Sequence, residues 1–189
     1  MAIKFNGDLT TGDLTQWDSE TDAGGNGAYS GGYYAASTPL ASTAIWSAYL
    51  TKAVQRAFAI HGKFTFKALR NYTYNGVRTI TVLELLNNIT GNLKIDFQSN
   101  GTTKTLSRIN VIYRNAANSY AVAANTDLGD VNSPFTANVD ATVRFYLRMS
   151  DGFSWSADGV CKIWVNDVLL VNQTGLDWSM ATGVYFDSV

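Results

Sequence analysis

Apolar and polar positions alternate with a period of two in three segments of the chain. In Val139–Met149 the odd-numbered residues are apolar and the even-numbered ones are polar or charged, and Asn92–Phe97 and Ser107–Tyr113 repeat this alternation. Side chains along a β-strand point to opposite faces in turn, so the pattern predicts strands with one face on a core and one face directed away from it. Burial on one side only is typical of antiparallel sheets.

The rest of the chain predicts further short strands, separated by clusters of Gly, Asn and Asp that are typical of turns. The predicted strands are Ala2–Phe5, Tyr33–Ser37, Ala44–Leu50, Lys63–Arg70, Thr79–Leu86, Leu93–Gln98, Thr105–Arg114, Ser119–Ala123, Val139–Ser150, Val160–Asn166, Val168–Asn172 and Gly183–Val189. One short helix is a candidate, over Lys52–Phe58. So many short strands predict two packed sheets, and we expect an all-β, antiparallel jelly-roll β-sandwich. We expect one domain over residues 1–189, and a trimmed continuation beyond Val189 stays open.

The composition of the chain argues against nucleic acids and membranes as binding partners. The net charge is −1, and the seven Lys and seven Arg are scattered, so we expect no nucleic-acid surface. No apolar run reaches the roughly 20 residues that span a bilayer, which argues against membrane insertion. Thr, Asn and Ser together number 50, which indicates a neutral polar surface suited to extended β-structure. Cys161 alternates with Ile163 and Val165, and we expect it to be buried.

Two segments resemble the concanavalin A-like lectin and glucanase superfamily, in its laminin-G-like form. The opening, Phe5–Trp17, is similar to the start of such domains, where a short strand leads through a Gly-Asp-Leu turn to a Trp. The segment Gly159–Val171 resembles the late hairpin of that fold, with Asp167 where Gly is usual. An Asn-Asp pair still permits a tight turn, because both residues tolerate positive φ. The resemblance implies a jelly-roll sandwich over nearly the whole chain.

The resemblance also implies glycan cleavage as one function of this fold. The glucanase branch carries Glu and Asp residues alternately along one strand, and this chain has no such run. Its two Glu are Glu20 and Glu84, and Glu84 has no acidic residue within ten positions on either side. Hydrolysis needs two facing carboxyls about 5–10 Å apart. Only an Asp from another strand could complete such a pair with Glu84.

The lyase branch of similar sandwiches uses a catalytic Tyr with His or Gln and Arg partners. His61 is the only His, and its position beside Gly62 predicts a structural residue at a strand-edge turn. One His and one Cys exclude a zinc cage. A Ser–His–acid triad lacks a nucleophile-elbow motif. From these observations we expect no enzymatic activity.

Calcium is the cofactor that the resemblance implies, because two loops offer hard oxygen ligands. Asp127, Asp130 and Asn132 form one candidate set, and Asp18–Asp22 with the Gly-rich loop after it forms the other. Neither fits a spaced calcium-loop pattern. The alternative interpretation is that these side chains form turns with the backbone.

Exposed aromatic side chains are the candidates for glycan binding or for an interface between proteins. Phe153 and Trp155 share a loop rich in Ser, Asp and Gly, and Trp178 lies in a similar context. Trp164 alternates with the apolar residues of its strand, so we expect it on the face opposite Cys161. Aromatic residues dominate sandwich cores, so most of the five Trp, which include Trp17 and Trp46, are expected to be core residues.

Three functions stay open from the sequence. The leading hypothesis is a non-catalytic structural or surface-display module of a virus or phage particle, decorating a capsid or tail. Such a module would assemble in the host cytoplasm with copies of itself on a larger scaffold, and would hold glycans. The chain opens with Met and lacks the charged start and apolar stretch of a signal peptide. The alternatives are a carbohydrate-binding module of a secreted multidomain enzyme and a divergent glycan-cleaving enzyme.

Overall fold

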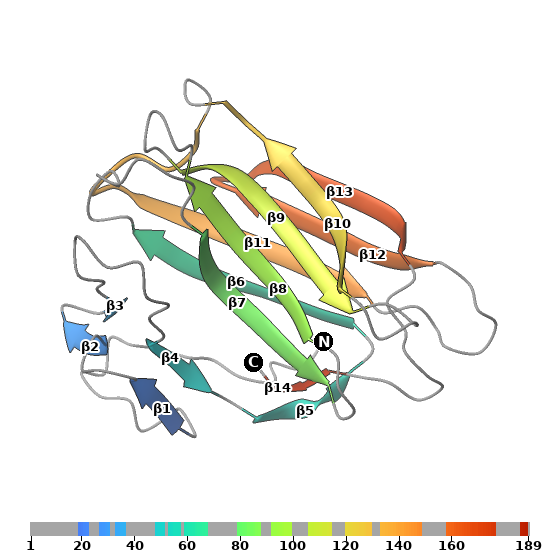
Figure 1. The fold of residues 1–189 in the computed structure, drawn as a ribbon, viewed down its shortest axis with the longest axis horizontal. Coiled ribbons are helices and arrows are strands. Elements are labelled where there is room, and N and C mark those ends of the chain that lie inside the picture. The colour runs from blue at the N-terminus through green and yellow to red at the C-terminus, as the bar shows by residue number, and fades with distance from the viewer. Residues whose placement is uncertain are drawn as a thin grey trace. The chain divides into compact units, whose positions relative to one another are not determined.

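The computed structural model describes the backbone of residues 19–22, 27–30, 33–36, 48–51, 53–57, 59–67, 79–87, 92–99, 106–114, 120–129, 133–148, 158–176 and 186–188. Among these residues every regular element is a β-strand (Figure 1). The chain divides into two compact units, residues 1–55 with 188–189 and residues 56–187. The expectation of one domain over residues 1–189 stays a prediction.

The first unit contains two short antiparallel pairs. Strand β1 (Ser19–Asp22) pairs with β4 (Ala48–Thr51), and β2 (Gly27–Ser30) pairs with β3 (Tyr33–Ala36). Strands β3 and β4 overlap two of the strands that the sequence predicts. The predicted strand Ala2–Phe5 lies outside the described residues.

The second unit is built from strands of two antiparallel sheets, and the division between the units falls within β5 and within β14. The larger sheet has the order β10-β9-β8-β7-β14-β5, and the smaller has the order β13-β12-β11-β6. Figure 1 shows β7 to β10 as one layer and β6 with β11 to β13 as the other. The strands are β5 (Ala53–Ala57), β6 (Ala59–Lys67), β7 (Thr79–Asn87), β8 (Asn92–Ser99), β9 (Leu106–Arg114), β10 (Tyr120–Asp127), β11 (Asp140–Arg148), β12 (Gly159–Val165), β13 (Val168–Leu176) and β14 (Phe186–Ser188).

The core of the second unit lies between these two sheets. Phe97 of β8 is fully buried, and its ring meets the Phe66 ring of β6 edge-on, with centroids 5.1 Å apart. The Phe135 ring lies 4.4 Å from that of Phe97. Burial of apolar area at about 25 cal/mol per Å² favours this packing of the layers. The fully or almost fully buried aliphatic residues described are Leu93, Ile95, Leu106, Ile109, Val111, Ala141, Val143, Leu147, Ile163, Val165 and Val171.

The predicted all-β antiparallel sandwich is confirmed. The predicted helix over Lys52–Phe58 is wrong, because Ala53–Ala57 forms strand β5. A short helix gains few internal hydrogen bonds, whereas a neighbouring strand supplies backbone partners to a segment of any length. The predicted burial of Cys161 is confirmed, and desolvation raises the pKa of its thiol to about 12. Within the described ranges, no helix has the length and apolar character needed to cross a bilayer.

The late hairpin of strands β12 and β13 has the tight turn that its sequence predicts. The two turn residues, Asn166 and Asp167, have φ angles of 49° and 66°. Positive φ at both central residues matches the twist of the flanking strands. The N–H of Asn166 donates to the Thr142 carbonyl at 2.8 Å, and the N–H of Thr142 donates to Asn166 Oδ1 at 2.9 Å. These bonds tie the turn to the start of β11.

Candidate functional site

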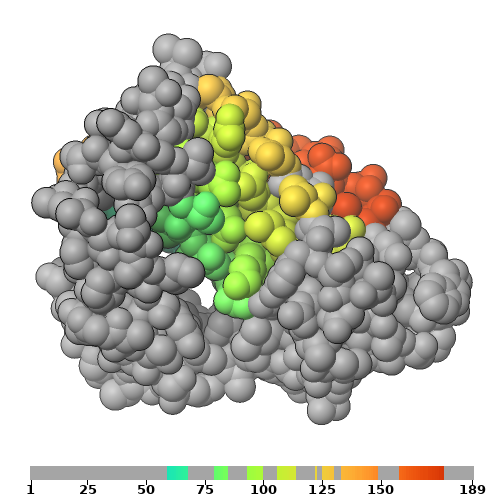
Figure 2. All heavy atoms as spheres, viewed as in Figure 1, coloured from blue at the N-terminus to red at the C-terminus, as the bar shows by residue number. Residues whose placement is uncertain are grey.

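The outward side of β7 to β10 carries polar side chains directed away from the core. Ile95 and Phe97 point into the core, so the alternation along β8 turns Asp96 to the other face. Figure 2 views the molecule with this sheet toward the reader, and described atoms of β7 to β10 are visible in green to yellow. The cross-strand register brings more polar residues to the same face. We call it the polar face, formed by Thr79, Thr81, Glu84, Lys94, Asp96, Gln98, Arg108, Asn110 and Asp127.

Asp96 is the buried carboxyl of the polar face. It is 4% exposed, and the Thr81 hydroxyl donates a 2.8 Å hydrogen bond to its Oδ1. Desolvation raises the pKa of Asp96, because burial disfavours the charged form. The hydrogen bond from Thr81 and the charge of Lys94 lower the pKa, and the charge of Glu84 raises it, but burial has the largest effect. Asp96 therefore keeps its proton to a higher pH than an exposed Asp.

Asn110 lies directly opposite Asp96 in the pairing of β8 with β9. It is 7% exposed, and its Oδ1 accepts no hydrogen bond within the described part of the chain. Leaving a buried acceptor unpaired costs about 1–3 kcal/mol. An acceptor in this position can accept a hydrogen bond from the hydroxyl of a bound sugar.

Glu84 supplies a second carboxyl group on the same face. Its Oε1 lies 3.4 Å from Nζ of Lys94, and the Glu84 side chain is 36% exposed. Glu84 pairs in register with Lys94, and Asp96 is two residues further along the same strand. Diagonal neighbours of this kind lie about 7–8 Å apart along the backbone, which is within reach of long side chains, and the charge of Glu84 acts on Asp96. The structure thus supplies from the neighbouring strand the acidic partner that Glu84 lacks along its own.

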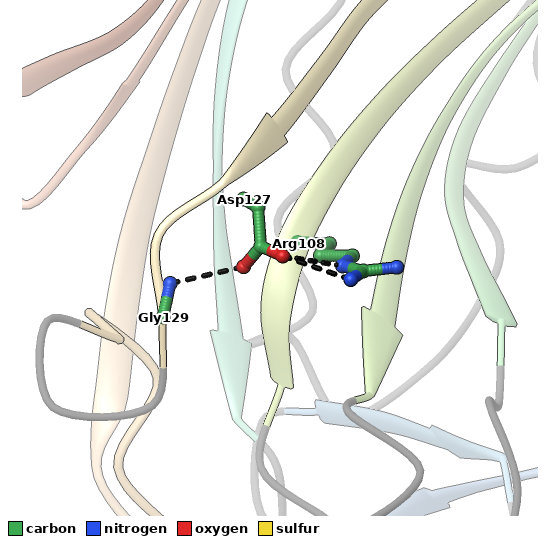
Figure 3. Close-up of polar contacts among 3 residues, drawn as sticks. All are labelled: Arg108, Asp127 and Gly129. Atoms are coloured by element: carbon green, nitrogen blue, oxygen red, sulfur yellow. Dashed lines mark hydrogen bonds and ion pairs between the residues drawn. The ribbon is translucent and has the colours of Figure 1, made fainter.

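Asp127 closes one edge of the polar face through an ion pair (Figure 3). Arg108 Nε donates to Asp127 Oδ2 at 2.9 Å, and a second guanidinium nitrogen lies 2.8 Å from the same oxygen. The N–H of Gly129 donates to the other oxygen, Oδ1, at 3.0 Å. The hydrogen bond from Gly129 and then the contact with Arg108 lower the pKa of Asp127. Both carboxylate oxygens thus face N–H donors, an arrangement that competes with a bound cation.

The outward side of the smaller sheet contains an open groove with a volume of about 380 Å³. We call it the basic groove, and it is lined by His61, Gly62, Arg144, Phe145, Tyr146, Lys162 and Trp164. The strand register aligns His61, Tyr146 and Lys162 in one cross-strand row. Trp164 is on the face opposite Cys161, as its alternation predicts, because Cys161 is buried in the core and Trp164 lines the groove.

The expectation that His61 lies at a strand-edge turn is wrong. His61 is exposed within strand β6, and Gly62 is part of the same strand. Gly62 is paired directly with Phe145, and a Cβ at Gly62 would lie 2.5 Å from Cζ of that ring. Glycine is therefore required here to admit the Phe145 ring, and it does not mark a turn.

Several predicted site residues lie outside the described residues. These are the aromatic candidates Trp17, Trp46, Phe153, Trp155 and Trp178, and the oxygen ligands Asp130 and Asn132. Among the residues with described side chains, no three His, Cys, Asp or Glu are grouped so as to hold a metal ion. Calcium binding stays a prediction. One feature of the sequence could have indicated the carboxyl pair. Strands β7 and β8 are separated by only four residues, which favours an antiparallel hairpin with Glu84 and Asp96 on neighbouring strands.

No protein-family model matches the chain, and no curated protein sequence matches it. Solved structures of the alginate lyase Aly36B are similar to it. A double mutant of that lyase in complex with alginate tetrasaccharide is 12% identical, with a TM-score of 0.52. The similarity covers 74% of this chain and 61% of the lyase chain. A structure described simply as Aly36B is 10% identical, with the same coverage and a TM-score of 0.49.

A further double mutant, in complex with alginate trisaccharide, is 12% identical with a TM-score of 0.49, and the similarity covers 74% of this chain and 62% of that one. The chain thus spans about three-fifths of the length of the lyase chain. The shared feature is the fold.

The expectation that the protein is not an enzyme is corrected by this similarity. The fold that it shares is that of a polysaccharide-degrading enzyme, an alginate lyase. The expectation rested on the absence of a second carboxyl near Glu84 along the sequence, and the strand pairing places Asp96 beside Glu84 on one face. It also rested on placing His61 in a turn, whereas His61 lies within a strand.

Proposed function

We propose that this protein cleaves the glycosidic bonds of a polysaccharide at the polar face, with Asp96 as the acid and Glu84 as the second catalytic carboxyl. The observation that carries the proposal is the placement of these two carboxyls in different environments on neighbouring strands. Asp96 is buried with a raised pKa, whereas Glu84 is partly exposed and ion-paired with Lys94. Two neighbouring carboxyls in such different surroundings, one buried and one partly exposed, are suited to acid–base catalysis.

The proposed reaction is hydrolysis. Asp96 gives its proton to the glycosidic oxygen as the bond from that oxygen to the anomeric carbon breaks. The Glu84 carboxylate either attacks the anomeric carbon or takes a proton from the water that attacks it. One water molecule is consumed, and its hydroxyl and hydrogen end on the two new chain ends. Asn110 lies opposite Asp96, and its Oδ1, which has no hydrogen-bond partner among the described residues, is available to accept a hydrogen bond from a sugar hydroxyl.

A polysaccharide is the substrate class that the similarity supports, because the related lyase was solved with alginate oligosaccharides. A lyase breaks the same kind of linkage by elimination, which leaves an unsaturated sugar at one new end. Hydrolysis leaves saturated ends on both fragments. Analysis of the products therefore distinguishes the two reactions.

The test is incubation of the full chain with a panel of neutral and acidic polysaccharides. We expect new reducing ends without ultraviolet absorbance from unsaturated sugars. Replacing Asp96 by Asn should lower the rate about 10²- to 10⁴-fold, the usual contribution of a positioned acid, and Glu84→Gln should have a loss of similar size. Asp140→Asn, the same chemical change on the smaller sheet and outside both candidate sites, is the matched control and should retain activity. Full activity in the Asp96→Asn variant would contradict the proposal.

The predicted placement on a virus or phage particle, with copies of the chain and a larger scaffold as partners, stays a prediction beside this proposal. So does the alternative of a secreted protein that carries this domain. Imaging of the native source, together with light scattering on the isolated chain, would test both.

A further inference from the structure

The basic groove has a regular arrangement of side chains that is independent of the proposed chemistry at the polar face. Strand pairing places Lys63, Arg144 and Trp164 in one row across β6, β11 and β12. The row of His61, Tyr146 and Lys162 lies two residues further along, which is about 6.6 Å away. Neighbouring strands are about 4.8 Å apart, so each row spans roughly 10 Å. The two rows form a patch large enough for two or more sugar rings.

Arg144 and Lys162 line the basic groove, and Lys63 is paired in register with Arg144 on the next strand. Lys63 is exposed and Lys162 is half-buried, and neither has a carboxylate partner within the described part of the chain. Among the described residues Arg144 forms an ion pair with Asp167 alone, at 3.0 Å, and the Asp167 side chain is 84% exposed. With Arg144, Lys162 and the neighbouring Lys63 against the one carboxylate of Asp167 among these described residues, this surface attracts anions. The attraction is stronger for an anion that displaces water from the groove.

Trp164 adds an apolar surface beside these cations. The Arg144 guanidinium carbon lies 5.4 Å from the centroid of the Trp164 ring, within the range of a cation–π contact. This contact holds both side chains at the groove and restricts the rotamers that a ligand would otherwise have to order. A planar indole beside fixed cations suits a ligand that alternates apolar ring faces with negative groups. Carboxylated sugars have this character.

Asp167 acts as an internal competitor for that ligand. It occupies a turn position with φ of 66°, where Gly is the usual residue, and its carboxylate contacts Arg144. An incoming carboxylate must replace Asp167 at the guanidinium. Exposed ion pairs contribute little free energy, so we expect the replacement of Asp167 to lower the affinity for the ligand by a small but measurable factor.

We propose that the basic groove binds an acidic, carboxylated polysaccharide, with the sugar carboxylates on Lys63, Arg144 and Lys162 and a sugar ring against Trp164. The groove anchors the polymer and does not cleave it. This inference does not depend on catalysis at the polar face. A polymer held in the basic groove would keep its other segments close to the protein, where the polar face can bind them.

The test is calorimetric titration of the full chain with alginate oligosaccharides, with neutral glucan oligosaccharides of equal length as the comparison. We expect binding of the acidic series only, weakened by added salt because the charges are partly exposed. Lys162→Gln, which keeps most of the side chain, should weaken binding about tenfold, and Trp164→Ala should weaken it by a similar factor. Asp167→Asn should strengthen binding about two- to fivefold, by removing the competing carboxylate.

Control variants separate this proposal from the proposed cleavage and from misfolding. Asp96→Asn should bind the acidic oligosaccharides as the unaltered protein does, even where it no longer cleaves them. Each variant is checked for an unchanged thermal unfolding midpoint, and Trp164→Phe replaces Trp164→Ala where the latter unfolds. Equal affinity for neutral and acidic oligosaccharides would overturn the proposal, as would equal affinity for polyphosphate. Unsaturated products that disappear in Tyr146→Phe would overturn the assignment of the groove to anchoring.

Discussion

The two outward faces of this sandwich arrange their charges in opposite ways. On the polar face Lys94 is paired with Glu84, and Asp96 is buried beside Thr81. Lys162 in the basic groove and Lys63 beside Arg144 have no carboxylate partner among the residues that the structure describes. Pairing and burial fix a group in place and change its proton affinity, which suits catalysis. Unpaired cations keep their attraction for a ligand, which suits binding.

The same strand pattern underlies both faces. Strands β8 and β11 each alternate core residues with polar ones, and both place their apolar side chains between the sheets. What differs is which residues the neighbouring strands bring opposite the polar positions. Asp96 has Thr81 and Asn110 as neighbours, whereas Arg144 has Lys63 and Trp164. Cross-strand partners therefore determine the chemistry of each face.

Removing the core ring that supports both faces should have the largest effect. Phe97 is fully buried and packs against Phe66 and Phe135, so Phe97→Ala should lower the free energy of unfolding by about 3–5 kcal/mol. Urea unfolding measures the change. Gln98→Ala, the next residue but on the outward side, is the control and should cost less than about 1 kcal/mol. Equal costs would mean that the assignment of the two faces of β8 is wrong.

Filling the space at Gly62 should disturb the basic groove and leave the polar face intact. A Cβ at this position meets the Phe145 ring at 2.5 Å, so Gly62→Ala should cost about 1–3 kcal/mol through overpacking. The double variant Gly62→Ala with Phe145→Leu should recover part of the loss, because the smaller side chain leaves room for the methyl group. If the double variant instead loses the sum of the two single losses, the Phe145 ring is not the source of the cost.

The pH dependence of stability should distinguish Asp96 from Asp127. The pKa of Asp96 is raised in the folded protein, so the folded state binds its proton more tightly than the unfolded state. Its contribution to stability is complete below the ordinary value of 3.8 and is lost as pH rises through the raised value. Asp96→Asn should remove this loss, as followed by urea unfolding over a pH series.

Asp127 should show the opposite dependence. Its pKa is lowered, so its contribution is present above the ordinary value and is lost as pH falls through the lowered one. Asp127→Asn should therefore reduce stability near neutral pH by a small amount, since the pair is exposed. Identical pH profiles for the two variants would contradict the difference in environment.

The fold could largely be predicted from the sequence, because alternation is a local property of each strand. The pattern of Val139–Met149 predicts β11 and its buried face, and Val143, Phe145 and Leu147 are core residues. The segment around β5 is the exception. Its helix-like pattern is too short to resist pairing at a sheet edge.

The candidate sites could be predicted only in part, because they depend on register between strands. Trp164 and Glu84 each carry a local signal. Nothing along a single strand places Asp96 diagonally across from Glu84, or His61 and Lys162 on the two sides of Tyr146. The prediction of a turn at His61 rested on the adjacent Gly62. The sequence does not distinguish a glycine that makes room for a neighbouring ring, as Gly62 does for Phe145, from a glycine in a turn. The register between two strands is set by how their apolar faces pack in the core, so it becomes visible only in the folded structure.

The central claim is that cleavage and anchoring belong to different faces, and one experiment tests it directly. Asp96→Asn and Lys162→Gln are each assayed for binding and for cleavage of the same acidic polysaccharide. We expect Asp96→Asn to bind as the unaltered protein does and to lose cleavage. Lys162→Gln should bind about tenfold more weakly while still cleaving when the polymer is saturating. Loss of both properties in each folded variant would contradict the account.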